Sequence, residues 1–200
     1  FAFTAAPVTV FLSGIIGSQF SPVKSLATLP MALSIVGIAI FAIFAAKIMS
    51  IIGRRAGFMF ASAVSSLSSV LAAYSIIIES FILFNFSCFL LGAGVAFSHQ
   101  YRFAAVETVK KDMPPKAISI ILLAGIGSAF IGPNVANITK SFIAEHLYAG
   151  SYIALAALTL TSTIFLLFYE DGHKPNHVNK KIKRSYLELI SQPRFLQALV

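Results

Sequence analysis

The sequence predicts an all-α membrane protein in which six helices cross the bilayer as one bundle. Hydrophobic residues make up 58% of the 200 residues and charged residues only 11%, whereas soluble domains carry about 25% charged residues. The charges are clustered, so six charge-free windows remain, each long enough to cross a hydrocarbon core of ~30 Å as a helix. These windows are apolar all round and lack the alternation of membrane β-strands, which favours helices over a barrel.

The first three spans are expected at residues 1–18, 25–46 and 58–78. Pro7 lies inside the first span, and Pro30 falls in the first turns of the second, where a missing N–H costs little. The third span is rich in serine and alanine, small residues that let neighbouring helices approach closely. Between the second and third spans, residues 47–57 are expected to form a cytoplasmic loop.

The last three spans follow a short turn at Glu79 and Ser80, which makes the third and fourth helices antiparallel neighbours. The fourth span begins at Phe81 and is expected to continue as helix to Lys111, before Pro114 and Pro115 stop it, because proline cannot continue a helix. The fifth and sixth spans are expected at residues 117–138 and 149–168.

Three segments are expected along the chain. Residues 1–168 form an N-terminal transmembrane domain whose first helix is truncated, because the sequence starts inside an apolar run. Residues 169–192 form a polar cytoplasmic linker, and residues 193–200 open a seventh transmembrane helix, with Pro193 suited to a helix start.

The basic residues predict the orientation of the chain. Thirteen of them fall on one side of the six-span arrangement: Lys47, Arg54, Arg55, Arg102, Lys110, Lys111, Lys116, Lys174, Lys180, Lys181, Lys183, Arg184 and Arg194. Only Lys24 and Lys140 fall on the other side. Cytoplasmic loops carry the excess of Lys and Arg, so the side with thirteen is expected in the cytoplasm, together with the N-terminus.

One motif follows the second span, where Gly53, Arg54 and Arg55 close the stretch that starts at Lys47. This stretch resembles the loop between spans two and three of the major facilitator superfamily, which reads G-x-x-x-D-R-x-G-R-R. Ala46 stands at the position of the first glycine and Ser50 at that of the aspartate. In the family, the aspartate is thought to dock on the other half of the transporter and favour the outward-open state. The serine puts that latch in doubt here.

Two further stretches carry the resemblance. Gly132 and Pro133 in the fifth span look like a degraded form of the family's glycine-proline motif, with a plain helix kink as the equally open alternative. The stretch from His99 to Ala105, followed by Glu107, resembles a motif of a poorly characterised bacterial branch. Cys88 stands where many proton antiporters of the family carry an arginine.

The resemblance implies a fold and a function. It implies a six-helix bundle of two three-helix repeats, the N-terminal half of a secondary transporter in the bacterial inner membrane. The expected partners are the lipid bilayer, a small-molecule solute and a missing C-terminal six-helix half. Solute would move by alternating access with no covalent chemistry, and proton-coupled efflux is one mode that this leaves open. The substrate is not predicted.

Candidate solute-binding residues follow from the helices that line the family's central cavity. They are Thr9, Ser13, Ser34, Asn85, Asn134 and Asn137. The last two lie three residues apart and share one helix face. An amide facing lipid is costly, so both are expected to point into the protein, toward either solute or another helix.

A second set of candidates, for gating, lies at the cytoplasmic end: Ser50, Gly53, Arg54, Arg55, His99, Arg102 and Glu107. Arg102 is interpreted as an interfacial anchor or as a gate held by Glu107. His99 is interpreted as a hydrogen-bonded interfacial residue or as a proton relay. No Asp or Glu falls inside a predicted span, so a proton-carrying acid is expected in the missing half.

Other functions are weighed against transport. No cofactor or metal site is expected, since one cysteine cannot build a ligand cluster. The dispersed basic residues argue against nucleic-acid binding, and the absence of a nucleophile with a base argues against an enzyme. A receptor or assembly protein on the same scaffold stays open as the alternative to a transporter.

Overall fold

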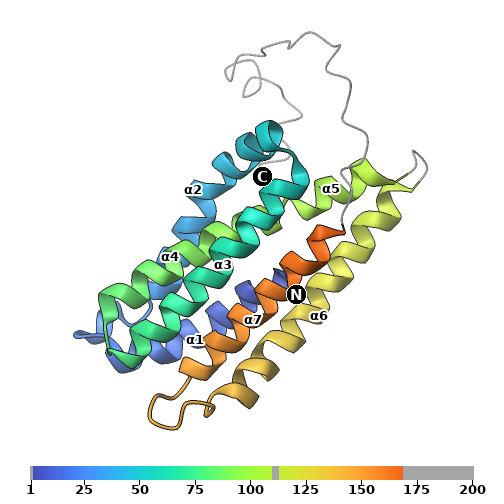
Figure 1. The fold of residues 1–200 in the computed structure, drawn as a ribbon. Coiled ribbons are helices and arrows are strands. Elements are labelled where there is room, and N and C mark those ends of the chain that lie inside the picture. The colour runs from blue at the N-terminus through green and yellow to red at the C-terminus, as the bar shows by residue number, and fades with distance from the viewer. Residues whose placement is uncertain (1, 110–112, 169–200) are drawn as a thin grey trace.

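Every regular element in the computed structural model, which describes residues 2–109 and 113–168, is a helix (Figure 1). The long helices are α1 (Ala5–Phe20), α2 (Leu29–Ile52), α3 (Arg54–Ile77), α4 (Phe81–Ser98), α6 (Pro114–Thr139) and α7 (Ala149–Leu167). The short ones are η1 (Ala2–Thr4), η2 (Lys24–Leu26) and α5 (Tyr101–Thr108). Six segments are long and apolar enough to cross a membrane. The predicted all-α class and the six spans are therefore confirmed.

The six long helices form two layers. In the first, the four-helix layer, α2, α4, α1 and α6 lie side by side in that order. In the second, the two-helix layer, α3 packs against α2 and α4, while α7 packs against α3, α6 and α1. Figure 1 views the bundle from the side of α3 and α7, with α1 behind them. The opposite side of the four-helix layer has no covering helix in the described part of the chain.

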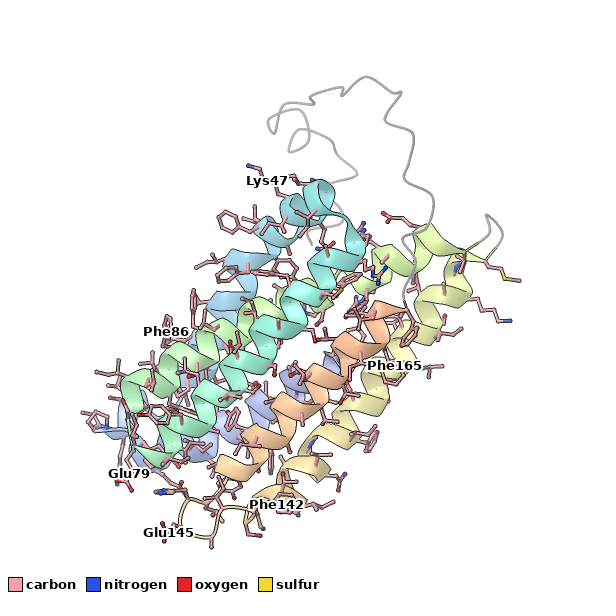
Figure 2. All side chains as sticks on the ribbon, in the orientation of Figure 1. Lys47, Glu79, Phe86, Phe142, Glu145 and Phe165 are labelled. Carbon is pink, nitrogen blue, oxygen red and sulfur yellow. The ribbon has the colours of Figure 1, made fainter. Side chains whose placement is uncertain are left out.

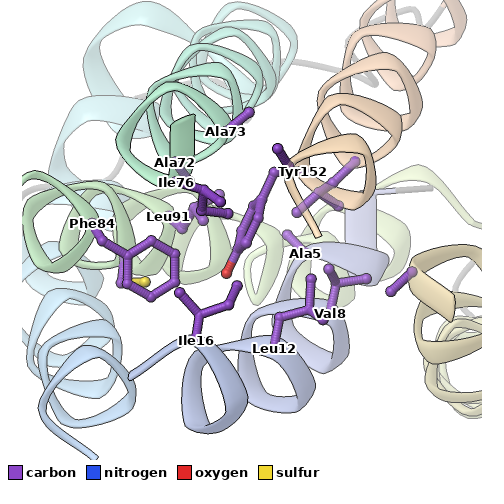
Figure 3. Close-up of a cluster of buried hydrophobic side chains, with 14 of the residues drawn as sticks. Ala5, Val8, Leu12, Ile16, Ala72, Ala73, Ile76, Phe84, Leu91 and Tyr152 are labelled. Carbon is purple, nitrogen blue, oxygen red and sulfur yellow. The ribbon is translucent and has the colours of Figure 1, made fainter. Parts of the chain in front are cut away.

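The main apolar core lies where α1, α3, α4 and α7 meet (Figure 3). Tyr152 of α7 is fully buried there, and its ring meets Phe84 of α4 edge-on, with centroids 5.8 Å apart. Leu12 and Ile16 of α1 close the same space from the other layer. A fully buried aromatic removes a large apolar area from its surroundings, so this contact anchors α7 to the four-helix layer.

Glycines set a close contact between two helices, α2 and α4. A Cβ on Gly37 would overlap the carbonyl oxygen of Phe89, and a Cβ on Gly92 would overlap that of Ser34. The two backbones therefore touch, as small residues allow in membrane helices.

The predicted loop at residues 47–57 is wrong. Helix α2 runs on to Ile52 and α3 begins at Arg54, so a single residue, Gly53, joins them. Hydropathy marks where the hydrocarbon core ends, whereas the helices extend beyond it into the region where charged side chains are tolerated.

The predicted helix through Lys111 is also wrong within the described residues. Helix α4 ends at Ser98, His99 and Gln100 form a turn, and the separate α5 follows. Pro114 and Pro115 begin α6 rather than stop α4, which suits proline because first-turn N–H groups lack helix partners anyway.

The remaining predictions divide into three groups. The turn at Glu79 and Ser80 and the position of Pro30 in the first turn of α2 are confirmed. Pro7 lies inside the first span, as predicted, and occupies the first turn of α1. The predicted linker at 169–192 and the seventh helix at 193–200 lie outside the described residues.

Candidate functional site

The turn between α2 and α3 brings two arginines to the end of the bundle that the charge distribution predicts to be cytoplasmic. Gly53 adopts φ 89° and ψ 165°, a region essentially restricted to glycine. This turn places Arg54 and Arg55 in the first turn of α3, where the positive end of the helix dipole disfavours cations. Both arginines therefore need acceptors from elsewhere in the bundle.

Arg54 finds its acceptor on α5. Its Nη2 lies 2.6 Å from Oε1 of Glu107 and its Nε lies 3.0 Å from Oε2, so the pair is bidentate. Its Nη1 also lies 3.8 Å from the sulfur of Met49 on α2. The pair is partly exposed and stabilises the fold by only about 0–1 kcal/mol. Its larger effect is geometric, because two parallel hydrogen bonds fix the position of α5 against α3.

Arg55 binds a different helix. Its Nη2 donates to the carbonyl oxygen of Leu167, 2.5 Å away at the end of α7. The last carbonyls of a helix have no partners within it, and cations are favourable there. The Gly-Arg-Arg turn thus connects the ends of α2, α3, α5 and α7.

Of the two interpretations of Arg102, the gate held by Glu107 does not match the structure, because Glu107 pairs with Arg54 while Arg102 lies exposed. The cluster from His99 to Arg102 divides at the turn before α5. His99 is exposed, whereas Tyr101 faces inward and stacks on Phe58 with centroids 4.1 Å apart. Ser50 donates to the carbonyl of Lys47 in its own helix. The gating roles of these residues remain predictions.

Four of the six solute-binding candidates are buried inside this half of the bundle: Thr9, Ser13, Ser34 and Asn85. Thr9 donates to the carbonyl of Ala5, and Asn85 donates to that of Phe81. The Oδ1 of Asn85 has no partner among the described residues. In this conformation these four polar groups face neighbouring helices rather than an open cavity.

The other two candidates, Asn134 and Asn137, are exposed. They lie on the side of α6 opposite the one that packs through Ser128 and Gly132. Within this half, therefore, they do not point into the protein, although they were expected to. Helix α6 continues through Gly132 and Pro133, and Gly132 faces Pro7 and Val8 of α1.

Sequence reasoning missed two features. One is the uncovered side of α1, where Val10, Phe11 and Gly14 are exposed. A search restricted to polar residues cannot find an apolar binding surface.

The second missed feature is a hydrogen-bonded seam between α3 and α7. Ser62 donates to the carbonyl of Thr159 and lies 3.0 Å from the hydroxyl of Ser162, Thr163 donates to Ser62, and Ser66 donates to the carbonyl of Ala156. The serine-rich composition of the third span was the signal available, but composition cannot tell packing from hydrogen bonding.

No group of three or more His, Cys, Asp or Glu side chains gathers as a metal site in the part of the chain that the structure describes. The candidate chemistry of the described residues therefore consists of hydrogen bonding, charge pairing between Arg54 and Glu107, and apolar contact.

Comparison with known proteins gives consistent matches. The Major Facilitator Superfamily profile matches residues 1–200. A riboflavin transporter of Brucella anthropi is 30% identical over 195 residues, which is 96% of this chain and 49% of the relative. Two uncharacterized MFS-type transporters of Bacillus subtilis are each 28% identical, over 81% and 73% of this chain and 38% and 34% of their own lengths.

This chain thus spans about half the length of the riboflavin transporter, and less of the other two. No solved structure matches it significantly. The profile match covers the whole sequence, and the six apolar helices agree with it. The chain belongs to the Major Facilitator Superfamily and is an integral membrane protein.

Proposed function

We propose that the full-length protein is a secondary active transporter that moves a small solute across the cytoplasmic membrane by alternating access. The uncovered side of the four-helix layer carries this proposal. Helix α1 packs through one side and leaves the other, with Val10, Phe11 and Gly14, exposed near mid-span. A second helical bundle facing this side would enclose a path for solute between the two halves.

Helix α1 illustrates the point. Leu12 and Ile16 are fully buried, whereas Phe11 and Gly14, on the opposite side of the helix, are exposed. A Cβ on Gly14 would meet nothing within 4 Å. Packing inside this half therefore does not require glycine there, and close approach of a solute or a facing helix would.

Riboflavin is the first solute to test. The relative that is 30% identical over 96% of this chain is a riboflavin transporter. Flat aromatic rings bind well against aromatic side chains, and Phe11 is exposed on the uncovered side of α1. These observations support a flavin-sized aromatic solute, with the direction of movement to be read from the assay.

The test is uptake and release of radiolabelled riboflavin in cells that lack their own flavin transporter. The full-length protein should move riboflavin. Phe11→Ala should raise the KM for riboflavin by a larger factor than the factor by which it lowers the amount of protein in the membrane. Phe60→Ala removes a comparably exposed phenylalanine from α3, in the other layer, and should leave KM unchanged.

Equal effects of the two substitutions would contradict the role of the uncovered side. Binding of riboflavin without movement would favour the receptor alternative. Movement of other solutes but not riboflavin would keep the transporter and reject the substrate.

A further inference from the structure

A small polar cavity lies where α3, α4 and α7 meet beneath η1 and the start of α5. Its lining is Ala2, Phe58, Ala61, Ser62, Ser65, Ser98, Tyr101 and Thr159. The interior leaves ≈ 10 Å³ for the centre of a water-sized sphere, which is about the space that one water molecule requires.

One hydroxyl on this cavity, that of Ser65, has no hydrogen-bond partner among the described residues. Ser65 is only 5% exposed, and the glycine opposite it on α4, Gly94, leaves the space that its hydroxyl fills. The neighbouring hydroxyls differ, because Ser62 donates to the Thr159 carbonyl and Ser98 donates to the Gly94 carbonyl. Leaving a buried hydroxyl unpaired costs about 1–3 kcal/mol, so its placement against a polar cavity points to a ligand.

We propose that one ordered water molecule occupies this cavity and pairs with Ser65. The water accepts from the Ser65 hydroxyl and donates to oxygens of the lining residues Ser98 and Thr159, which belong to α4 and α7. It thereby links α3 to α4 and α7, to which the Ser65 hydroxyl makes no direct hydrogen bond. Buried waters make about three hydrogen bonds to otherwise unpaired polar groups.

The chemistry of the lining selects water over other small ligands. The lining contains no carboxylate or other charged side chain, so a cation would be buried without a counter-charge, at high cost. An apolar ligand would leave the Ser65 hydroxyl unpaired. The stacked rings of Phe58 and Tyr101 belong to the same lining and place two reactive aromatic side chains beside the water.

Hydroxyl-radical footprinting with a short X-ray pulse tests the proposal on the full-length protein in lipid nanodiscs, because a bound water becomes a radical that labels adjacent side chains. Phe58 is 1% exposed but lines the cavity, whereas Phe84 is equally buried in the dry core. Phe58 should be labelled well above Phe84. Labelling of Phe58 at the level of Phe84 would overturn the proposal.

Two substitutions on α3 sharpen the test. Ser65→Ala removes the donor, and labelling of Phe58 should fall to the level of Phe84. Ser69→Ala is the matched control, because Ser69 is also buried but donates to the Ser65 carbonyl of its own helix; it should leave the labelling of Phe58 unchanged. Undiminished labelling in Ser65→Ala would reject Ser65 as the partner.

Ser98→Ala tests the same water from α4, and should also lower Phe58 labelling. The melting temperature of the wild-type protein, compared in sodium and choline chloride, separates water from a cation. Equal values support water. A rise in sodium that Ser65→Ala abolishes would replace the water with a sodium ion.

Discussion

The buried side chain of Tyr152 has two parts, a hydroxyl and a ring, that differ in how they contribute to the stability of the bundle. Tyr152 is among the largest fully buried side chains, and its hydroxyl has no hydrogen-bond partner among the described residues. Its polar neighbour is the thiol of Cys88, and thiols accept hydrogen bonds only weakly. The ring, rather than the hydroxyl, holds α7 against α4.

Tyr152→Phe should therefore leave the free energy of unfolding unchanged or raise it by up to about 1–3 kcal/mol, the cost of an unpaired buried polar group. Tyr152→Ala should lower it by about 3–5 kcal/mol, because the ring and its packing are lost. Thermal unfolding of the purified full-length variants in detergent measures both. A Tyr152→Phe protein that melts well below wild type would mean that the hydroxyl has a partner.

Residue types could be predicted from the sequence, but their partners could not. Arg54, Glu107 and Asn85 were all identified as candidates for a site. The pairing of Arg54 with Glu107 spans 53 positions and depends on how α5 turns away from α4, which local sequence does not encode. Asn85 was placed by analogy with cavity helices, yet the side of α4 on which it lies packs inside this half.

At the scale of elements, Gly53 is the narrowest connection in the fold, a single residue between two helices of 24 residues each. Gly53→Ala would force a Cβ into a backbone region that side chains rarely adopt, at a cost of about 1–3 kcal/mol. The substitution should lower the melting temperature and loosen the Arg54–Glu107 pair that the turn positions.

Gly125→Ala is the matched control for this prediction. Gly125 lies in α6, where a Cβ would meet nothing within 4 Å, and alanine in a helix is more stable than glycine by roughly 0.5–1 kcal/mol. The control should melt at or above the wild-type temperature. Equal melting of Gly53→Ala and wild type would show that the turn relaxes to accept a side chain.

Element number and order could be predicted because unbroken apolar runs carry that information directly. Element ends could not be predicted to the same degree. Hydropathy changes where the bilayer ends, so α2 was cut short at Ala46 although it reaches Ile52. The break at His99 and Gln100 has no proline or glycine to mark it, and the start of α6 at two prolines was taken for a stop.

At the scale of the whole molecule, the two ends of the bundle differ in the charged residues that they carry. Figure 2 shows Lys47 at one end and Glu79 and Glu145 at the other. The described basic residues at the Lys47 end are expected in the cytoplasm by the positive-inside rule. Lys24, in the connection between α1 and α2, is expected outside.

Cysteine labelling checks this orientation. A membrane-impermeant maleimide should label Lys24→Cys in intact cells and Lys47→Cys only after the cells are opened, with Cys88→Ala removing the native thiol. Native Cys88 is fully buried, so the protein that keeps Cys88 and carries no introduced cysteine serves as the unlabelled control. The reverse pattern would place the N-terminus outside the cell.

The one-residue connection at Gly53 has a consequence for how the protein is made. Two long apolar helices joined so tightly leave the ribosome as a hairpin, and neither arm can enter the membrane far from the other. Helix α4 is the next to emerge, and it contacts both arms. These three helices can assemble before α6 and α7 are synthesised. Helix α6, the least enclosed of the spans, contacts η1, α1 and α5, which precede it, and α7, which follows it.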